Sequence, residues 1–399
     1  MIYNCIKFLA RCGLLFFFRR RIICGFPLHM LKGPAIIAAN HPNSMLDAVI
    51  LGCLCKQQVH FTIRSDMFHK PLFRSILKFL NAIPVYRVTE EKSRMRENFN
   101  VIDQCREILK KDGIIIIFSE GITVHEWKLK SLKSGTSRIV QHALLDDKVR
   151  NVLQVVPVGL TYSDYRHPGK TLIIQTGEIF YPGRQEQPVD SGAWKLQFNS
   201  QLYQKLHPLV PELTTNKKEA VNIWQILITN ITPMGNRNGF IPSISRQSLL
   251  LSAQDFASPL QQRLKRFFLP VQHDEIYKSY IALLLLTLPA LAGLILNGLF
   301  YFPVDSFVRA KTKNTIYFDS LFFGMMVILY PAYLLLLSVF LGYLTPVLPA
   351  LWLVLIPVSG WCSLQCWIFV IKIKNHLNLT GSERSYLIKM ITGLEVNSK

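Results

Sequence analysis

Short hydrophobic runs alternate with helix-period segments between about residues 34 and 181. Apolar runs of strand length lie at 35–40, 58–64, 82–88, 113–118, 153–162 and 171–179. Most of the stretches between them place apolar residues at helical spacing, at 44–54, 71–80, 91–111 and 134–145. Strands that alternate with helices are typical of an α/β domain. We therefore expect a mostly parallel sheet flanked by helices.

Three much longer apolar segments follow, at 281–302, 321–344 and 349–371. Each is long enough to cross a hydrocarbon layer of about 30 Å as a helix. The sequence thus predicts an integral membrane protein whose α/β domain precedes an α-helical transmembrane region. The number of true crossings stays open. The first segment contains Pro289 and Gly293 and could cross, or enter and return so that Lys311 lies on the side of the α/β domain.

The composition changes along the chain divide it into five parts. Residues 1–30 read as an interfacial membrane anchor, because the basic cluster at 19–21 follows the apolar run "GLLFFF", whereas a signal peptide has its basic residues first. We expect the α/β domain at 31–210 and a helical connector at 211–275. A transmembrane helical region at 276–372 and a polar tail at 373–399 complete the chain.

The net charge narrows the choice of partners. The chain has 45 Lys and Arg against 25 Asp and Glu, a formal charge of +20. Such a balance attracts anionic lipid, nucleic acid or phosphorylated substrates. Zinc-finger spacing, RNP-like aromatics and a basic zipper are all missing from the sequence, so we expect the lipid bilayer and phosphorylated ligands as partners and no nucleic acid. The eight cysteines form no Cys-x-x-Cys pair, and no metal site is expected.

The stretch "NHPNSMLD" directly follows the strand at 35–40 and holds His41 and Asp47. A single histidine at a strand end is more often structural than catalytic. Here, however, Arg87 and Glu120 follow two further predicted strands. Ligands of parallel sheets bind beyond the carboxyl ends of the strands, so these polar groups are expected to meet at one edge.

A histidine and a carboxylate at such an edge can perform acyl transfer. A neutral imidazole removes a proton from an alcohol as the alcohol attacks a carbonyl, and the carboxylate fixes the tautomer and stabilises the imidazolium. No side-chain nucleophile is required, because the attacking alcohol is itself a substrate.

Four segments then carry a family resemblance. In order, "NHPNSMLD", "IPVYR", "FSEG" and "VVPVGLTY" resemble the four blocks of the glycerophospholipid acyltransferase family, which includes lysophosphatidate and glycerol-3-phosphate acyltransferases. The resemblance covers residues 33–161. It implies that residues 31–210 form an acyltransferase domain.

The resemblance also implies roles for single residues. His41 would be the general base and Asp47 its partner, while Arg87 would bind the acceptor phosphate through its guanidinium fork. Glu120 would hold Arg87 or backbone donors in place, and with Gly121 would shape the phosphate-binding turn. The remaining candidate substrate contacts are Asn43, Ser44, Ser119, Lys133 and Pro157, the last on the acyl-donor side. Lys133 belongs to a basic run that suits a solvated face as well as a phosphate or lipid contact.

The chain departs from the family pattern at several positions. Five residues separate His41 from Asp47, one more than usual, and a loop at Pro42 is expected to absorb it. Asn81 stands where a glycine is usual, and Ser119 where a proline is usual. These changes bear on the identity of the acceptor more than on the type of reaction.

The sequence therefore predicts a membrane-bound O-acyltransferase of phospholipid biosynthesis, with its catalytic domain on the cytoplasmic face. The acyl donor would be acyl-CoA or acyl carrier protein, acting as co-substrate, with no cofactor. The acceptor stays open among glycerol 3-phosphate, dihydroxyacetone phosphate and 1-acylglycerol 3-phosphate. A phospholipid-remodelling transacylase and a non-catalytic membrane scaffold or transporter are the alternatives. Chain-length preference and oligomeric state are also open.

Overall fold

The computed structural model describes residues 2–69, 71–85, 97–184, 191–213, 221, 224–225, 228 and 275–382. The chain divides into two compact units. The first comprises Met1–Tyr162, Thr171–Thr214 and Pro233–Leu250, and the second comprises Ser163–Lys170, Thr215–Thr232 and Leu251–Lys399. The predicted connector lies mostly outside the described residues, as does the end of the polar tail.

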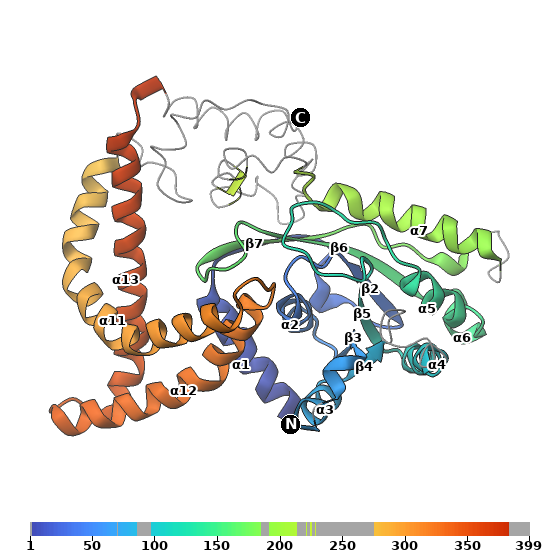
Figure 1. The fold of residues 1–399 in the computed structure, drawn as a ribbon, viewed down its shortest axis with the longest axis horizontal. Coiled ribbons are helices and arrows are strands. Elements are labelled where there is room, and N and C mark those ends of the chain that lie inside the picture. The colour runs from blue at the N-terminus through green and yellow to red at the C-terminus, as the bar shows by residue number, and fades with distance from the viewer. Residues whose placement is uncertain are drawn as a thin grey trace. The chain divides into compact units, whose positions relative to one another are not determined.

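A seven-stranded sheet forms the centre of the first unit (Figure 1). Its strands are β1 (Phe18–Gly25), β2 (Ala35–Ala39), β3 (Val59–Arg64), β4 (Ala82–Val85), β5 (Ile114–Phe118), β6 (Gln154–Tyr162) and β7 (Lys170–Thr176), in the order β1-β7-β6-β2-β5-β3-β4. Strand β2 pairs in parallel with both β5 and β6, and β3 pairs in parallel with β4 and β5. Strands β6 and β7 pair in the antiparallel sense. The prediction of a mostly parallel sheet is confirmed.

Helices cover the sheet. They are α1 (Ile2–Phe17), α2 (Met45–Leu54), α3 (Pro71–Phe79), α4 (Glu97–Lys110), α5 (Gly135–Ala143), α6 (Asp147–Arg150) and α7 (Gly192–Leu206), with 3-10 turns at Leu28–Met30, Ser65–Phe68, Pro182–Arg184 and His207–Leu209. Figure 1 shows α2 and α7 on opposite sides of the sheet. The strands at the centre are buried on both faces, which explains why their sequences are continuously apolar.

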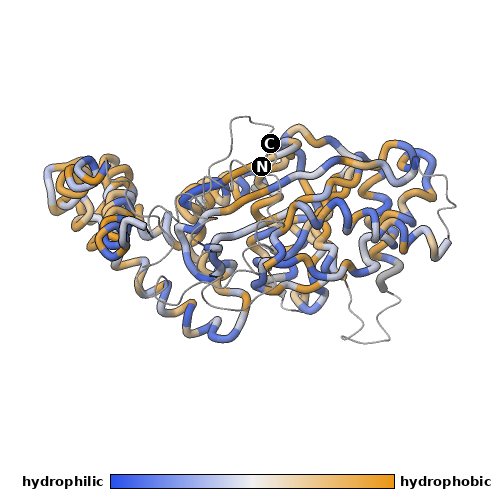
Figure 2. The backbone as a smooth tube through the Cα atoms, turned by 90° about the horizontal axis from the view of Figure 1, so that it is seen from above, coloured by the Kyte–Doolittle hydropathy of each residue, from blue (hydrophilic) through white to orange (hydrophobic). Residues whose placement is uncertain are grey.

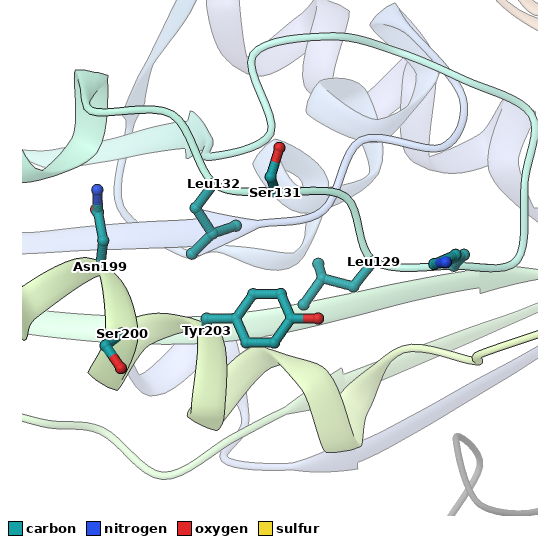
Figure 3. Close-up of a pocket in the computed structure, with 7 residues that line it drawn as sticks. Leu129, Ser131, Leu132, Asn199, Ser200 and Tyr203 are labelled. Atoms are coloured by element: carbon teal, nitrogen blue, oxygen red, sulfur yellow. The ribbon is translucent and has the colours of Figure 1, made fainter. Parts of the chain in front are cut away.

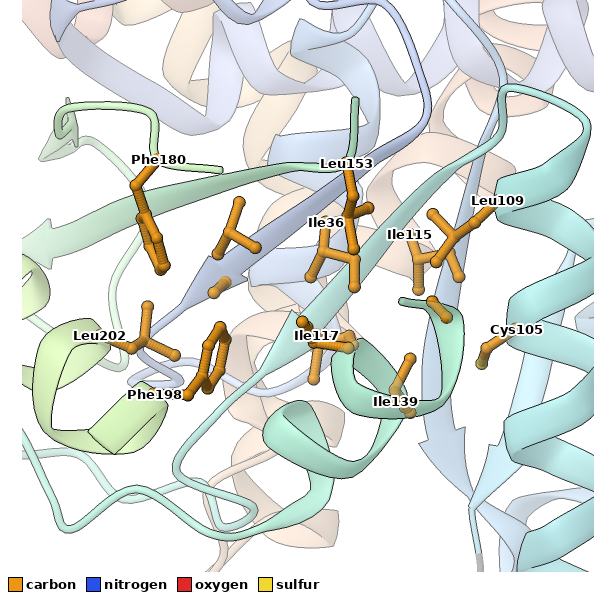
Figure 4. Close-up of a cluster of buried hydrophobic side chains, with 14 of the residues drawn as sticks. Ile36, Cys105, Leu109, Ile115, Ile117, Ile139, Leu153, Phe180, Phe198 and Leu202 are labelled. Atoms are coloured by element: carbon orange, nitrogen blue, oxygen red, sulfur yellow. The ribbon is translucent and has the colours of Figure 1, made fainter. Parts of the chain in front are cut away.

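One hydrophobic core fills the space between the sheet and helices α4 to α7 (Figure 4). Alternate residues of the central strands enter it, among them Ile36 of β2 and Ile115 and Ile117 of β5. Phe198 and Leu202 of α7 meet them from the helix side. This packing holds β2, β5 and β6 rigidly, and so fixes the edge where these strands end.

Residues 18–25, which the sequence analysis assigned to the membrane anchor, form strand β1 beside β7. Phe18, Ile22 and Cys24 are buried, while Arg21 and Ile23 are exposed. The three consecutive arginines obscured this alternation of buried and exposed residues in the sequence. They are compatible with a strand because β1 lies at the edge of the sheet, where charged side chains are tolerated. Membrane contact of residues 1–30 stays a prediction, and within them α1 exposes Phe8, Leu15 and Phe16.

The second unit contains the three long helices α11 (Ile276–Lys311), α12 (Phe318–Leu344) and α13 (Pro349–Asn378). Each is long and apolar enough to cross a membrane, and Figure 2 shows the hydropathy along the chain. Helices α11 and α13 approach closely at Gly293, where an added Cβ would lie 2.0 Å from the Ser359 carbonyl oxygen. Asn297 then donates to the Ile356 carbonyl at 3.0 Å. Small residues and side-chain hydrogen bonds of this kind are what joins helices inside lipid. We conclude that the protein is embedded in a membrane.

The loop between β6 and β7 packs on the turn between α11 and α12, within the second unit. Arg166 donates to the carbonyl oxygens of Thr315 and Thr312, both at 3.1 Å. Lys170 and Asp319 form an ion pair whose side chains are 1% and 0% exposed. Removing one partner of such a pair leaves an uncompensated buried charge, so this loop and this turn are firmly joined.

Candidate active site

The candidate site begins where β2 ends, between its two neighbours β5 and β6. Ala39 lies beside Phe118 of β5 and Val158 of β6. Asn40 continues the pairing with its side chain: its amide nitrogen donates to the Leu160 carbonyl at 3.0 Å, and its amide oxygen accepts from the Leu160 N–H at 2.7 Å. The chain is therefore held against β6 immediately before His41.

His41 and Asp47 lie in contact. Nδ1 of His41 is 2.9 Å from Oδ2 of Asp47, although five residues separate them. Asp47 is the third residue of α2, and its Oδ2 also accepts from the N–H of Asn43 at 2.7 Å. The loop before α2 thus accommodates the extra residue.

Ser44 directly precedes α2, but its side chain makes no capping hydrogen bond. Its backbone has φ 53°, a left-handed value that is uncommon for a residue other than glycine. Asp47 instead bonds back to the N–H of Asn43, in the manner of the acidic residue in a capping box. The carboxylate therefore closes the loop and contacts the imidazole at once.

The His41 ring has a defined orientation. It stacks on Phe118 with ring centroids 3.9 Å apart and an angle of 13° between the planes. The side chain of His41 is 17% exposed, whereas that of Asp47 is 0% exposed. The hydrogen bonds recorded for the ring within the described residues use Nδ1 only. Nε2 is consequently the nitrogen that a substrate hydroxyl could meet.

Glu120 follows β5 and holds two backbone donors. Its Oε2 accepts from the N–H of His41 and its Oε1 from the N–H of Lys130, each at 2.8 Å. Burial raises the pKa of this carboxyl, and the two backbone hydrogen bonds oppose that shift. Glu120 therefore ties the loop after β5 to the residue that carries the imidazole, which matches the backbone-holding role expected of it.

Ser119, Gly121 and Lys133 lie together beside Glu120. The N–H of Lys133 donates to the Ser119 carbonyl at 2.8 Å. Gly121 has φ +66°, and an added Cβ would approach Cγ of Lys133 to 3.0 Å. The turn thus requires glycine, and the exposed lysine lies over it. A lysine cation beside such a turn is suited to a phosphate.

The predicted substrate residue Pro157 stands apart from this group. Pro157 lies inside the sheet, paired with Ala38, and is buried. Arg87 lies outside the described residues, which stop at Val85 and resume at Glu97. Two further predicted substrate residues are buried: Asn43 is 0% exposed and Ser44 is 7% exposed.

Tyr162 and Phe118 contact the His41–Asp47 pair but were missed in the sequence. The hydroxyl of Tyr162 donates to Oδ1 of Asp47 at 2.5 Å. Both residues end strands that neighbour β2. The sequence feature that could have indicated them is their position at the end of a predicted strand, "VVPVGLTY" for Tyr162 and "IIIIF" for Phe118.

Thiol chemistry is disfavoured at the buried cysteines of this unit. Burial raises the pKa of Cys53 to about 11 and the pKa values of Cys55 and Cys105 to about 12. These thiols stay protonated and are poor nucleophiles at neutral pH. Among the described residues, no group of three or more His, Cys, Asp or Glu could hold a metal ion.

A shallow pocket of about 500 Å³ lies between the loop at residues 128–132 and α7 (Figure 3). It is lined by Lys128, Leu129, Ser131, Leu132, Asn199, Ser200 and Tyr203. None of the candidate site residues is among them. The position of this pocket therefore does not coincide with the His41–Asp47 pair.

Comparison with known proteins identifies this part of the chain. Residues 20–161 match the family model described as Acyltransferase. The chain thus contains a segment similar to the Acyltransferase family. Among solved structures, the chain is similar to the 1-acyl-sn-glycerophosphate (LPA) acyltransferase PlsC from Thermotoga maritima, with 16% identity and a TM-score of 0.37 over 52% of this chain and 78% of that chain. No curated protein matches the chain.

The residues of the site lie inside the acyltransferase segment, which ends at Thr161, except for Tyr162, which follows the segment directly. His41, Asp47 and Glu120 come from different parts of this segment and meet through the strand order β6-β2-β5. The site therefore belongs to the acyltransferase domain and not to the helical unit.

Proposed function

We propose that the protein is a membrane-bound O-acyltransferase that moves a fatty acyl group from acyl-CoA or acyl carrier protein to a hydroxyl of a glycerol phosphate. The observation that carries the proposal is the His41–Asp47 contact of 2.9 Å inside the acyltransferase segment. The acceptor is glycerol 3-phosphate or 1-acylglycerol 3-phosphate, and the reaction is a step in phospholipid biosynthesis.

The reaction needs one proton transfer at His41. Nε2 removes the proton of the acceptor hydroxyl while the hydroxyl oxygen attacks the thioester carbonyl. Asp47 holds the Nδ1–H tautomer and stabilises the imidazolium. The C–S bond then breaks, the thiolate takes the proton from His41, and an ester and a free thiol result. No acyl-enzyme intermediate is formed.

Recognition of the acceptor phosphate is assigned to the turn after β5 and to Arg87. Gly121 permits the left-handed backbone of this turn, and Lys133 places a cation beside it. Arg87 follows the β4 segment in the sequence, and its planar guanidinium suits a phosphate. We place this edge on the cytoplasmic side of the membrane, where acyl thioesters are supplied.

The test uses the purified full chain in lipid nanodiscs. Radiolabelled glycerol 3-phosphate, dihydroxyacetone phosphate or 1-acylglycerol 3-phosphate is supplied with acyl-CoA or acyl carrier protein thioester, and ester products are separated. We expect His41→Ala to lower turnover by about 10²- to 10⁴-fold, the usual worth of a general base.

The matched control is His142→Ala. His142 of α5 forms a second His–Asp pair with Asp103 of α4 at 2.7 Å, and the two side chains are 31% and 52% exposed. Its loss should leave turnover unchanged. Equal turnover by the wild type and His41→Ala, or no ester with any acceptor, would refute the proposal.

A further inference from the structure

Tyr162 completes the surroundings of the Asp47 carboxylate. It is the last residue of β6, 115 positions from Asp47, and both residues are 0% exposed. Its hydroxyl donates to Oδ1 at 2.5 Å, at the short end of hydrogen bonds to a charged oxygen. A buried hydrogen bond to an ionised group is among the stronger contacts in a protein.

The two oxygens of Asp47 have different partners. Oδ2 accepts from the N–H of Asn43 and contacts Nδ1 of His41. Oδ1 accepts from Tyr162, the one partner recorded for it among the described residues. The tyrosine therefore determines how the carboxylate plane is turned, and with it the direction in which Oδ2 faces the imidazole.

Tyr162 is itself held in place on both sides. The indole N–H of Trp127 donates to its backbone carbonyl at 2.6 Å. Its ring packs on Phe18 of β1 with centroids 6.1 Å apart. The hydroxyl is thus presented to Asp47 by a rigid frame, and rigid supporting contacts are what keep catalytic groups within a fraction of an ångström of their working geometry.

We propose that Tyr162 is a positioning residue for the acyl transfer, acting on His41 through Asp47. This inference rests on the proposed function. Without the hydroxyl, the carboxylate can turn about its Cβ–Cγ bond and the imidazole loses its fixed direction. Small misplacements of a catalytic group lower turnover by up to about 10²-fold.

A double-mutant cycle separates positioning from general structural support. We expect Tyr162→Phe to lower kcat by about 10- to 10²-fold, with the KM of acceptor and donor nearly unchanged. In the Asp47→Ala background the same change should alter kcat by less than about threefold, because the side chain through which it acts is already absent. Equal losses in both backgrounds, or no loss in the first, would overturn the proposal.

Tyr330→Phe is the matched control. It also removes a tyrosine hydroxyl that donates to a side chain, Oδ1 of Asn297 at 2.7 Å, but in the helical unit. It should change kcat by less than about twofold in either background, within the additivity expected of independent sites.

A second measurement does not depend on turnover. Thermal unfolding of the same four proteins of the cycle should show a larger drop in midpoint for Tyr162→Phe in the wild type than in Asp47→Ala. Equal drops would show that Tyr162 does not restrain Asp47. Coupled drops together with a wild type that forms no ester would support the restraint while refuting the proposed function.

Discussion

Replacing Asp47 by asparagine tests what the carboxylate contributes to the His41 pair. Two N–H groups point at Oδ2 of Asp47: the ring Nδ1–H of His41 and the backbone N–H of Asn43. An asparagine amide has one acceptor oxygen, so we expect that oxygen to occupy this place. The amide nitrogen then faces the Tyr162 hydroxyl, which can turn to accept from it. The tautomer of His41 is retained, and what is lost is the negative charge.

The size of the effect follows from that charge. An imidazolium and a carboxylate about 4 Å apart attract each other by about 4 kcal/mol at an effective dielectric constant of 20. Since each 1.36 kcal/mol is a tenfold change in rate, kcat should fall by about 10³-fold. An amide turned the other way would impose the wrong tautomer, for which the loss is about 10⁴-fold.

The assay is single-turnover ester formation by Asp47→Asn and wild type at saturating acceptor and donor. Thermal unfolding and retention in the membrane fraction check that the variant is folded. KM for both substrates should stay nearly unchanged, because Asp47 is buried behind His41. A loss of less than tenfold would refute the reasoning, since the carboxylate would then contribute little to the transition state.

Three further results are expected. Glu120→Gln should lower the free energy of unfolding by about 1–3 kcal/mol, because an amide cannot accept from both backbone N–H groups at once; a thermal midpoint equal to that of the wild type would contradict this. Arg87→Lys should raise acceptor KM more than donor KM, because lysine lacks the planar two-pronged contact, and the reverse pattern would reassign the residue. A single cysteine at Lys311 in a cysteine-depleted chain should react with an impermeant thiol reagent only after sealed cells are opened, because the linker after α11 is basic and basic loops tend to lie on the cytoplasmic side. Labelling from outside would show that α11 crosses the membrane with its end on the far side.

The sequence by itself determined the two kinds of structure in this chain. Short continuous apolar runs such as "AIIAA" and "IIIIF" are typical of strands in a sheet covered on both faces, and they became β2 and β5. Segments of more than twenty apolar residues have no stable place in a small soluble core, and they became α11, α12 and α13. The positions of His41 and Glu120 at strand ends were likewise readable, because parallel strands end at one edge.

Only the tertiary structure decided which strands are neighbours. Periodicity tells which residues are buried but not the order of strands, and the order β6-β2-β5 is what brings Tyr162 and Phe118 to His41 and Asp47. Backbone donors are equally invisible in a sequence, since every residue other than proline has one. The sequence could therefore not show which backbone donors Glu120 holds, and these are the N–H groups of His41 and Lys130. Long-range packing selected those partners, and local pattern could not.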